Sequence, residues 1–165
     1  IAVIQFDIET GTISREFNRN IDIQSSLDLG FAINGDTLEW WFAQPNRMDM
    51  FKDKQPIKNV LDELEQFLTH RTSIRDLVKE EQTKKKTFVW GNGASFDLGI
   101  LGSAFIRCGM GIPWKFFNER DVRTLVSLMP EVKKNAVNNG IPHNPLDDCR
   151  FQIAYCSEIW RRLKK

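Results

Sequence analysis

The sequence lacks the features that would place it in a membrane, secreted or disulfide-rich class. Its 165 residues contain no apolar run of the roughly 18 to 20 residues that a transmembrane helix needs, and no basic-then-apolar signal peptide opens the chain. The three cysteines, Cys108, Cys149 and Cys156, form no CxxC motif, which excludes a disulfide framework and a zinc knuckle. We therefore expect reduced thiols in a cytoplasmic protein. The sequence leaves open what precedes Ile1.

An excess of charge of either sign is also missing. The chain has 23 basic and 22 acidic residues and a net charge of +1, so it demands no polyanionic partner, although a local basic patch would suffice to bind phosphate. Hydrophobic residues at 41% and aromatic residues at 11% are typical of a folded globular protein. A chain of 165 residues and 19.2 kDa predicts a single domain over residues 1–165.

Two carboxylates end the first predicted strand. The run over residues 2–11 is short, apolar and β-branched, and it ends in Asp7 and Glu9 before a Thr10-Gly11 turn. Because residues i and i+2 of a strand share a face, we expect Asp7 and Glu9 to project side by side. A raised pKa, a basic partner or a divalent cation would offset their repulsion. From this segment alone, two solvated surface acids are as good an interpretation as a metal site.

The next segment carries a hairpin signal. Residues 27–33 and 37–42 are strand-like and flank Asn34-Gly35, a pair favoured in tight hairpins, which predicts an antiparallel meander of the first three strands. Residues 12–24 are interpreted as an excursion or a short extra strand, and residues 43–55 as a loop.

The second half of the sequence alternates helices and strands. Apolar spacings of three and four predict helices, with turn residues at their ends. The predicted helices cover residues 56–68, 74–82, 96–108 and 122–129, and Pro130 ends the last of these. A closing helix begins at Leu146 or Asp147. The predicted strands cover residues 87–91 and 114–117. Lys84, Lys85 and Lys86 are interpreted as a solvated helix end or a phosphate contact.

Four acids and one histidine stand beside predicted chain turns. Asp7 and Glu9 lie at the end of the first predicted strand. Asp97 follows a later strand and its turn, and Asp148 opens the closing helix, five residues after His143. Each is weak evidence alone, because an acid near a helix start is commonly a cap. Asp121 is interpreted in this way, as an N-cap or salt-bridge partner.

Together these residues resemble a known family. Residues 6–11 resemble the motif D-x-E-T, residues 92–97 resemble a motif ending in F-D, and residues 143–148 resemble H-x-x-x-x-D. This ordered set is similar to the DEDDh group of 3′-to-5′ exonucleases, which has the ribonuclease-H-like fold. Residues 90–98 and 120–124 most resemble its small bacterial and phage branch, typified by the exoribonuclease RNase AS. The resemblance implies an α/β domain with a central mixed five-stranded sheet, an antiparallel meander followed by parallel strands, flanked by helices.

The resemblance also implies roles for the matched residues. Asp7, Glu9, Asp97 and Asp148 would bind two divalent cations, and His143 would be the general base. Oxygen ligands without cysteine favour Mg²⁺ or Mn²⁺, and two such ions can hold the attacking water and the leaving 3′ oxygen. Histidine suits proton removal because its unperturbed pKa is about 6.5. The expected products are nucleoside 5′-monophosphates. Asp147 could exchange roles with Asp148, although the spacing from His143 favours Asp148.

The expected substrate is a single-stranded 3′ end, with RNA slightly favoured over DNA. The resemblance implies a grip by the backbone near Thr10 and Gly11 and by the apolar side chains of Ile8, Trp90 and Phe96. Taken singly, each of these three side chains is better explained as a core residue, because aromatic residues beside a strand are usually buried. A homodimer is expected from the RNase AS branch. Two alternatives stay open: a catalytically silent nucleic-acid or protein binding module on the same fold, and a proofreading or processing subunit of a larger assembly.

Overall fold

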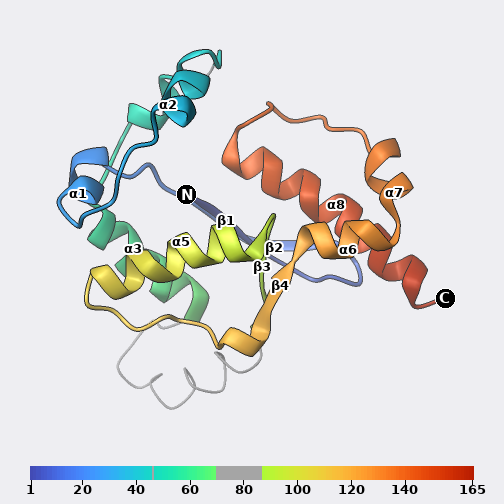
Figure 1. Ribbon diagram of the computed structural model, residues 1–165. Coiled ribbons are helices and arrows are strands. Elements are labelled where there is room, and N and C mark those ends of the chain that lie inside the picture. The colour runs from blue at the N-terminus through green and yellow to red at the C-terminus, as the bar shows by residue number, and fades with distance from the viewer. Residues whose placement is uncertain (46, 70–86) are drawn as a thin grey trace.

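The structure is a computed structural model that describes residues 1–45, 47–69 and 87–165. Figure 1 shows the arrangement of its elements. In chain order these are the strands β1 (Ala2–Phe6) and β2 (Ile13–Asn18), the helices α1 (Ile23–Leu27) and α2 (Gly35–Phe42), a single 3₁₀ turn (Asp49–Phe51), α3 (Ile57–Thr69), β3 (Val89–Gly91), α5 (Ala94–Arg107), a second 3₁₀ turn (Phe116–Asn118), β4 (Glu119–Asp121), α6 (Val122–Leu128), α7 (Pro130–Asn135) and α8 (Pro145–Leu163).

The strands form two separate pairs. β1 and β2 are antiparallel, with a register from Ala2 opposite Asn18 to Phe6 opposite Ile13, whereas β3 and β4 are parallel. In the part of the chain that the structure describes, these pairs are two two-stranded sheets, so the α/β class is confirmed and the continuous five-stranded sheet is wrong. Two reasons are visible: one predicted strand is a helix, and β1 and β3 do not pair with each other.

The predicted hairpin around Asn34 and Gly35 is also wrong, because these residues begin α2. The Asn34 side chain accepts a hydrogen bond from the Thr37 backbone N–H at 2.8 Å and so caps the helix. Gly35 has no positive φ, which the hairpin turn favoured by Asn-Gly requires. Asparagine is as good an N-cap as it is a turn residue, so the dipeptide alone does not distinguish the two structures.

Other predicted elements have mixed outcomes. β2 confirms the short extra strand, and α3, α5 and α8 confirm predicted helices. The strand expected at 114–117 is wrong, since a 3₁₀ turn lies there and β4 follows it. Pro130 also begins α7 at its first position, where the missing N–H is no loss. The helix expected at 74–82 and the lysines after it lie outside the described residues.

Helices cover the strands on two sides (Figure 1). α3 and α5 supply most of one core cluster, which includes Leu61, Leu64 and Phe105, all fully buried. α6, α7 and α8 build the other, around Tyr155 and Ile159. α8 packs along β1. No helix among the described residues is long and apolar enough to cross a membrane.

Glycine substitutions distinguish the helix at Gly35 from the hairpin. Gly35→Ala is expected to stabilise the fold by about 0.4–1 kcal/mol, since the new Cβ meets nothing within 4 Å and glycine costs entropy in a helix. Gly11→Ala is the matched control and should destabilise by roughly 1–2 kcal/mol, because Gly11 has a φ of +77°. Urea unfolding measures both free energies, and a destabilised Gly35→Ala variant would restore the hairpin interpretation.

Candidate active site

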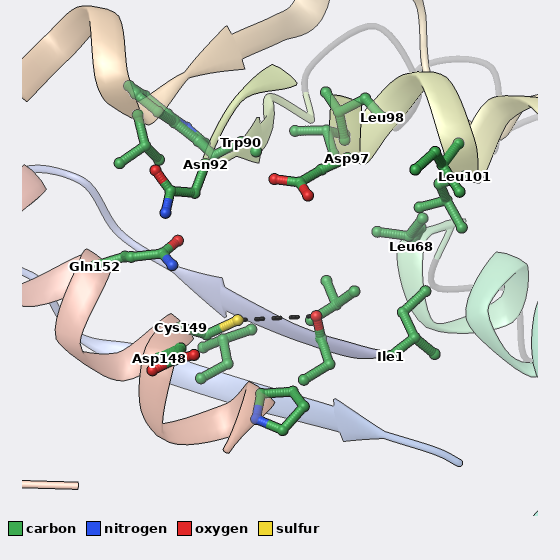
Figure 2. Close-up of a pocket in the computed structure, with 18 of the residues that line it drawn as sticks. Ile1, Leu68, Trp90, Asn92, Asp97, Leu98, Leu101, Asp148, Cys149 and Gln152 are labelled. Atoms are coloured by element: carbon green, nitrogen blue, oxygen red, sulfur yellow. Dashed lines mark hydrogen bonds between the residues drawn. The ribbon is translucent and has the colours of Figure 1, made fainter. Parts of the chain in front are cut away.

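A cavity of about 910 Å³ separates the two strand pairs. Its lining includes all of β1, all of β3 and one side each of α3, α5 and α8, so it extends along the whole length of β1. Figure 2 shows Asp97 and Asp148 on opposite walls of this cavity, with Asn92 and Gln152 nearby. The cavity therefore contains two of the predicted metal ligands.

The close approach of α5 to β3 positions Asp97. A Cβ atom on Gly91, the last residue of β3, would lie 3.2 Å from the Asp97 Cβ and 3.3 Å from its Oδ2, so a side chain there would require Asp97 to move by a few tenths of an ångström. Gly93 caps α5 with a φ of +108°. Asp97 lies in the first turn, where the partial positive charge of the helix N-terminus favours a carboxylate.

Asp121 fixes the start of α5 from the neighbouring strand. Its Oδ2 accepts a hydrogen bond from the Ala94 N–H at 2.6 Å, and its Oδ1 accepts bonds from the Thr124 N–H and hydroxyl at 2.7 and 3.0 Å. The backbone hydrogen bond from Ala94 is the main reason that the pKa of Asp121 is lowered. The predicted N-cap role is confirmed, and the same side chain ties β4 to α5.

His143 and Asp148 lie together where α8 begins. Asn144 caps this helix by accepting hydrogen bonds from the Leu146 and Asp147 N–H groups. Asp148 is half-buried; burial raises its pKa, while the charge of His143 and a hydrogen bond from the His143 backbone act in the opposite direction.

The His143 ring is exposed and contacts one aromatic neighbour. The ring lies edge to face with Trp40 of α2 at a centroid distance of 4.8 Å and an angle of 86°. The backbone of His143 is in the left-handed region, with a φ of +63°, which is unusual for a residue other than glycine. The orientation of His143 is thus determined by its loop and by Trp40 together.

Asp147 is engaged elsewhere. Its Oδ2 accepts a hydrogen bond from the Ile141 N–H at 3.0 Å, and its Oδ1 accepts one from Arg150 Nη1 at 2.8 Å. Arg150 in turn pairs with Glu16 of β2. These contacts hold the loop before α8. Of the two neighbouring acids, Asp148 lines the cavity and Asp147 does not.

Asp7 and Glu9 lie in a turn, not on a strand. β1 ends at Phe6, and Asp7 Oδ1 accepts hydrogen bonds from the N–H groups of Glu9 and Thr10 and from the Thr10 hydroxyl. The bonds from Thr10 are the main reason that the pKa of Asp7 is lowered. Glu9 is exposed and pairs with Lys164 at the end of α8. The Asp7 carboxylate therefore closes the β1–β2 turn.

The five predicted catalytic residues do not meet. Asp148 lies in the first turn of α8 and Lys164, the partner of Glu9, caps its other end; at about 1.5 Å per helical residue these positions are roughly 24 Å apart. Asp97 and Asp148 lie close enough to act on the same thiol, since the charge of each raises the pKa of Cys149. The structure brings Asp97, Asp148 and His143 to one region and leaves Asp7 and Glu9 outside it.

The residues as placed do not fit a two-ion centre. Carboxylate oxygens of Asp97 and Asp148 are suitable ligands for Mg²⁺ or Mn²⁺. Within the described ranges, however, no three His, Cys, Asp or Glu side chains come together as a metal-binding group. The carboxylate oxygens are the right kind of ligand for these ions, but two carboxylates are too few to hold two of them.

Some of the predicted substrate contacts lie in the β1–β2 turn, and others line the cavity. Thr10 binds Asp7 and Thr12 through its hydroxyl, and Gly11 packs near Ser157, so both serve the turn. Ile8 and Trp90 line the cavity and join a core cluster. Phe96 is 68% exposed in the first turn of α5, next to Asp97.

Sequence reasoning missed Trp40, Asn92 and Gln152. The Trp40-Trp41 pair was an available signal, but it lay in a segment interpreted as a strand. Gln152 follows Asp148 by one helical turn, a spacing that places both on one face of α8.

Comparison with protein families gives one match. The family model described as the 3′-5′ exoribonuclease Rv2179c-like domain matches residues 1–160. The comparisons with curated proteins and with solved structures find no match.

Removal of the Asp121 carboxylate should destabilise the fold. Asp121→Ala is expected to lower the free energy of unfolding by about 0.5–2 kcal/mol at neutral pH, the usual cost of a lost cap. Because the folded-state pKa of Asp121 is lowered, its stabilisation is present above the unfolded pKa of about 3.9 and is lost as the pH falls through the folded value. Urea unfolding from pH 7 to 3 should show the two proteins converging.

Asp62→Ala provides the control for this comparison. Among the residues that the structure describes, Asp62 forms one exposed ion pair, with Lys58, so its loss should change stability by less than about 0.5 kcal/mol. An equal effect of the two substitutions at neutral pH would contradict the role given to Asp121.

Proposed function

The chain belongs to the Rv2179c-like 3′-5′ exoribonuclease domain family, and from this premise we propose that it removes nucleotides from the 3′ end of single-stranded RNA as nucleoside 5′-monophosphates. Family membership establishes a 3′-5′ exonuclease, a hydrolase of phosphodiester bonds. The observation that supports the finer proposal is the placement of Asp148 against His143 at a cavity that Asp97 also lines.

His143 is the proposed general base. Hydrolysis requires that a proton leave the attacking water, and an exposed imidazole beside a carboxylate is well suited to accept it. The edge-to-face contact with Trp40 restricts rotation of the ring. The Asp148 carboxylate accepts a hydrogen bond from the His143 backbone and so holds the histidine at the start of α8.

Asp97 and Asp148 are the proposed cation ligands of this chain. A divalent cation, when bound, would stabilise negative charge on the phosphodiester. The requirement for two Mg²⁺ or Mn²⁺ ions stays a prediction, because two carboxylates do not complete such a centre. The chain's own contribution is to hold these acids on facing walls of the cavity (Figure 2).

Phe96 is the proposed contact for the terminal base. It is exposed in the α5 turn that carries Asp97, and aromatic stacking is tolerant of base identity. The proposed preference for RNA depends on contacts to the 2′-hydroxyl, which Asn92 and Gln152 have the amide chemistry to make.

Substitution of the proposed base tests the mechanism. His143→Ala should slow release of 5′-monophosphates from a 3′-labelled single-stranded RNA by about 10²–10⁴-fold, the usual contribution of a general base. His70→Ala, which changes the chain's other histidine, is the control and should cleave at the parent rate. Single-turnover assays with excess enzyme and Mn²⁺ measure both rates, and equal loss in the two variants would contradict the assignment.

Substitution of the acids distinguishes the cavity from the turn. Asp97→Asn and Asp148→Asn should each lower activity by at least about 10- to 100-fold, whereas Asp7→Asn should retain most of it, because Asp7 serves the β1–β2 turn. The same assay after EDTA treatment should show no release until Mn²⁺ or Mg²⁺ is restored. Loss of activity on Asp7→Asn with an unchanged melting temperature would return Asp7 to the site.

A further inference from the structure

Three exposed phenylalanines lie where β3 and β4 begin. Phe88 directly precedes β3, and Phe116 and Phe117 lie in the 3₁₀ turn that leads into β4 (Figure 1). Because β3 and β4 pair in parallel, these approaches lie at the same end of the pair. The three side chains are 54%, 81% and 55% exposed, respectively. We call these phenylalanines, together with Arg120 of β4, the aromatic platform.

Arg120 connects the rings of the platform. Its guanidinium carbon lies 4.4 Å from the centre of the Phe88 ring, and its Nη1 donates to the Phe117 carbonyl at 2.9 Å. The Phe116 and Phe117 rings meet edge to face at a centroid distance of 5.3 Å. No carboxylate in the part of the chain that the structure describes forms an ion pair with Arg120. Its guanidinium is therefore fixed in place while its charge is not neutralised by those residues.

The turn that carries Phe116 and Phe117 is held from beneath. Trp114 and Asn118, which flank the two phenylalanines in the sequence, are both buried, and Trp114 belongs to a core cluster. The Trp114 indole N–H also donates to Glu119 Oε1 at 2.9 Å. The exposed rings are thus presented by an anchored backbone, which lowers the entropy that a ligand must overcome on binding.

The platform is continuous with the active-site cavity. Phe88 lines this cavity, as do Trp90 of β3 and Asp97 in the helix after it. β3 has 3 residues, so its length separates Phe88 from the turn before Asp97. At about 3.3 Å per residue this separation is roughly 10 Å, which about three stacked nucleotides would span at about 3.4 Å each. A strand whose 3′ end lies at Asp97 can therefore reach the platform.

We infer that the aromatic platform binds the single-stranded RNA upstream of its 3′ end, stacking about two or three bases there while the terminal nucleotide occupies the cavity. Aromatic rings and guanidinium planes stack on every base, so this contact adds affinity without a sequence preference. The inference rests on the proposed function for the identity of the strand, and it adds a second binding region to that function.

A nucleic-acid strand suits the platform better than a protein surface does. The 3₁₀ turn and β4 present no exposed aliphatic side chain beside Phe116 and Phe117. Burial of the Arg120 charge against a protein without a carboxylate partner would be unfavourable. The RNA backbone instead brings phosphates to that charge.

Photo-crosslinking tests where the strand lies. An oligouridine of about 12 nucleotides with a single 5-iodouridine is bound in EDTA, which prevents metal-dependent hydrolysis, then irradiated, and the labelled peptide is identified by mass spectrometry. Iodouridine about three to five nucleotides from the 3′ end should label Phe116 or Phe117, and iodouridine at the 3′ end should not. The platform is refuted if no internal position labels these residues, or if the 3′-terminal position labels them equally well.

Substitutions separate base stacking from general apolar contact. Phe116→Leu and Phe117→Leu keep an apolar side chain and remove the flat ring, so each should weaken binding of the same RNA in EDTA by about 5-fold or more. Phe116→Trp should bind at least as tightly as the parent. Fluorescence anisotropy of labelled RNA measures these affinities. Unchanged binding in both leucine variants, or a tryptophan variant as weak as Phe116→Leu, would contradict stacking.

Phe42→Leu is the matched control. Phe42 is 57% exposed, close to the value for Phe117, and it lies two positions after Trp40 in α2, so the two side chains leave the helix on different faces. Its substitution should leave RNA affinity at the parent value. An equal loss in Phe42→Leu and Phe117→Leu would show that any exposed ring contributes, and would overturn the platform.

Hydrolysis kinetics distinguish the platform from the proposed function. With Mn²⁺, the parent should have a lower KM for RNA of about 12 nucleotides than for RNA of about three, and Phe116→Leu should reduce this difference through KM while kcat for the longer RNA changes by less than about 2-fold. Crosslinking and binding without hydrolysis would refute the proposed function and leave the platform intact. Hydrolysis with the same length dependence in parent and variant would refute the platform and leave the proposed function intact.

Sedimentation velocity tests a second copy of the chain as the occupant. The parent and Phe116→Glu should have the same oligomeric state, because the platform is expected to face RNA. A parent dimer that Phe116→Glu converts to a monomer would make the platform an interface between copies, and would overturn its assignment to RNA.

Discussion

The pairing of strand edges is the constraint on which this structure depends. A backbone amide in an apolar interior needs a partner, and strands in the middle of a sheet find partners on both edges. Here β1 and β3 each have one partner strand among the described residues, and helices cover both faces of the gap between them. The cavity is therefore lined by apolar helix side chains and by the residues of β1 and β3.

The position of the gap also determines the composition of the site. Asp97 enters from the helix after β3 and Asp148 from the helix packed on β1, so each wall contributes one carboxylate (Figure 2). His143 joins through the loop before α8 and through Trp40. A metal-dependent phosphodiesterase site needs acids that converge on the phosphate, and Asp97 and Asp148 both line this cavity.

Local hydrogen bonds give the same residue type different roles in this chain. Asp7 accepts three bonds from its own turn, Asp121 joins two helix starts, and Asp147 holds a loop. Each of these carboxylates has neighbouring N–H groups as partners. Asp148 has burial and a histidine instead, which raise and lower its pKa respectively. Hydrogen-bond partners therefore distinguish Asp148 from the other three carboxylates.

The sequence by itself determined the helices with a clear apolar period, the first strand, the N-cap at Asp121 and membership of a 3′-5′ exonuclease family, because each of these depends on neighbours close in the chain or on the order of short motifs. It could not determine whether Asn34 turns a hairpin or caps a helix, because both are good local structures for asparagine. It could not place Asp7 either. The same local sequence, a carboxylate at the end of a strand, can close a turn or face a metal ion. Only the tertiary structure decided these points, because the distance from Asp7 to Asp148 is determined by how β1 and α8 pack and which strand edges remain open.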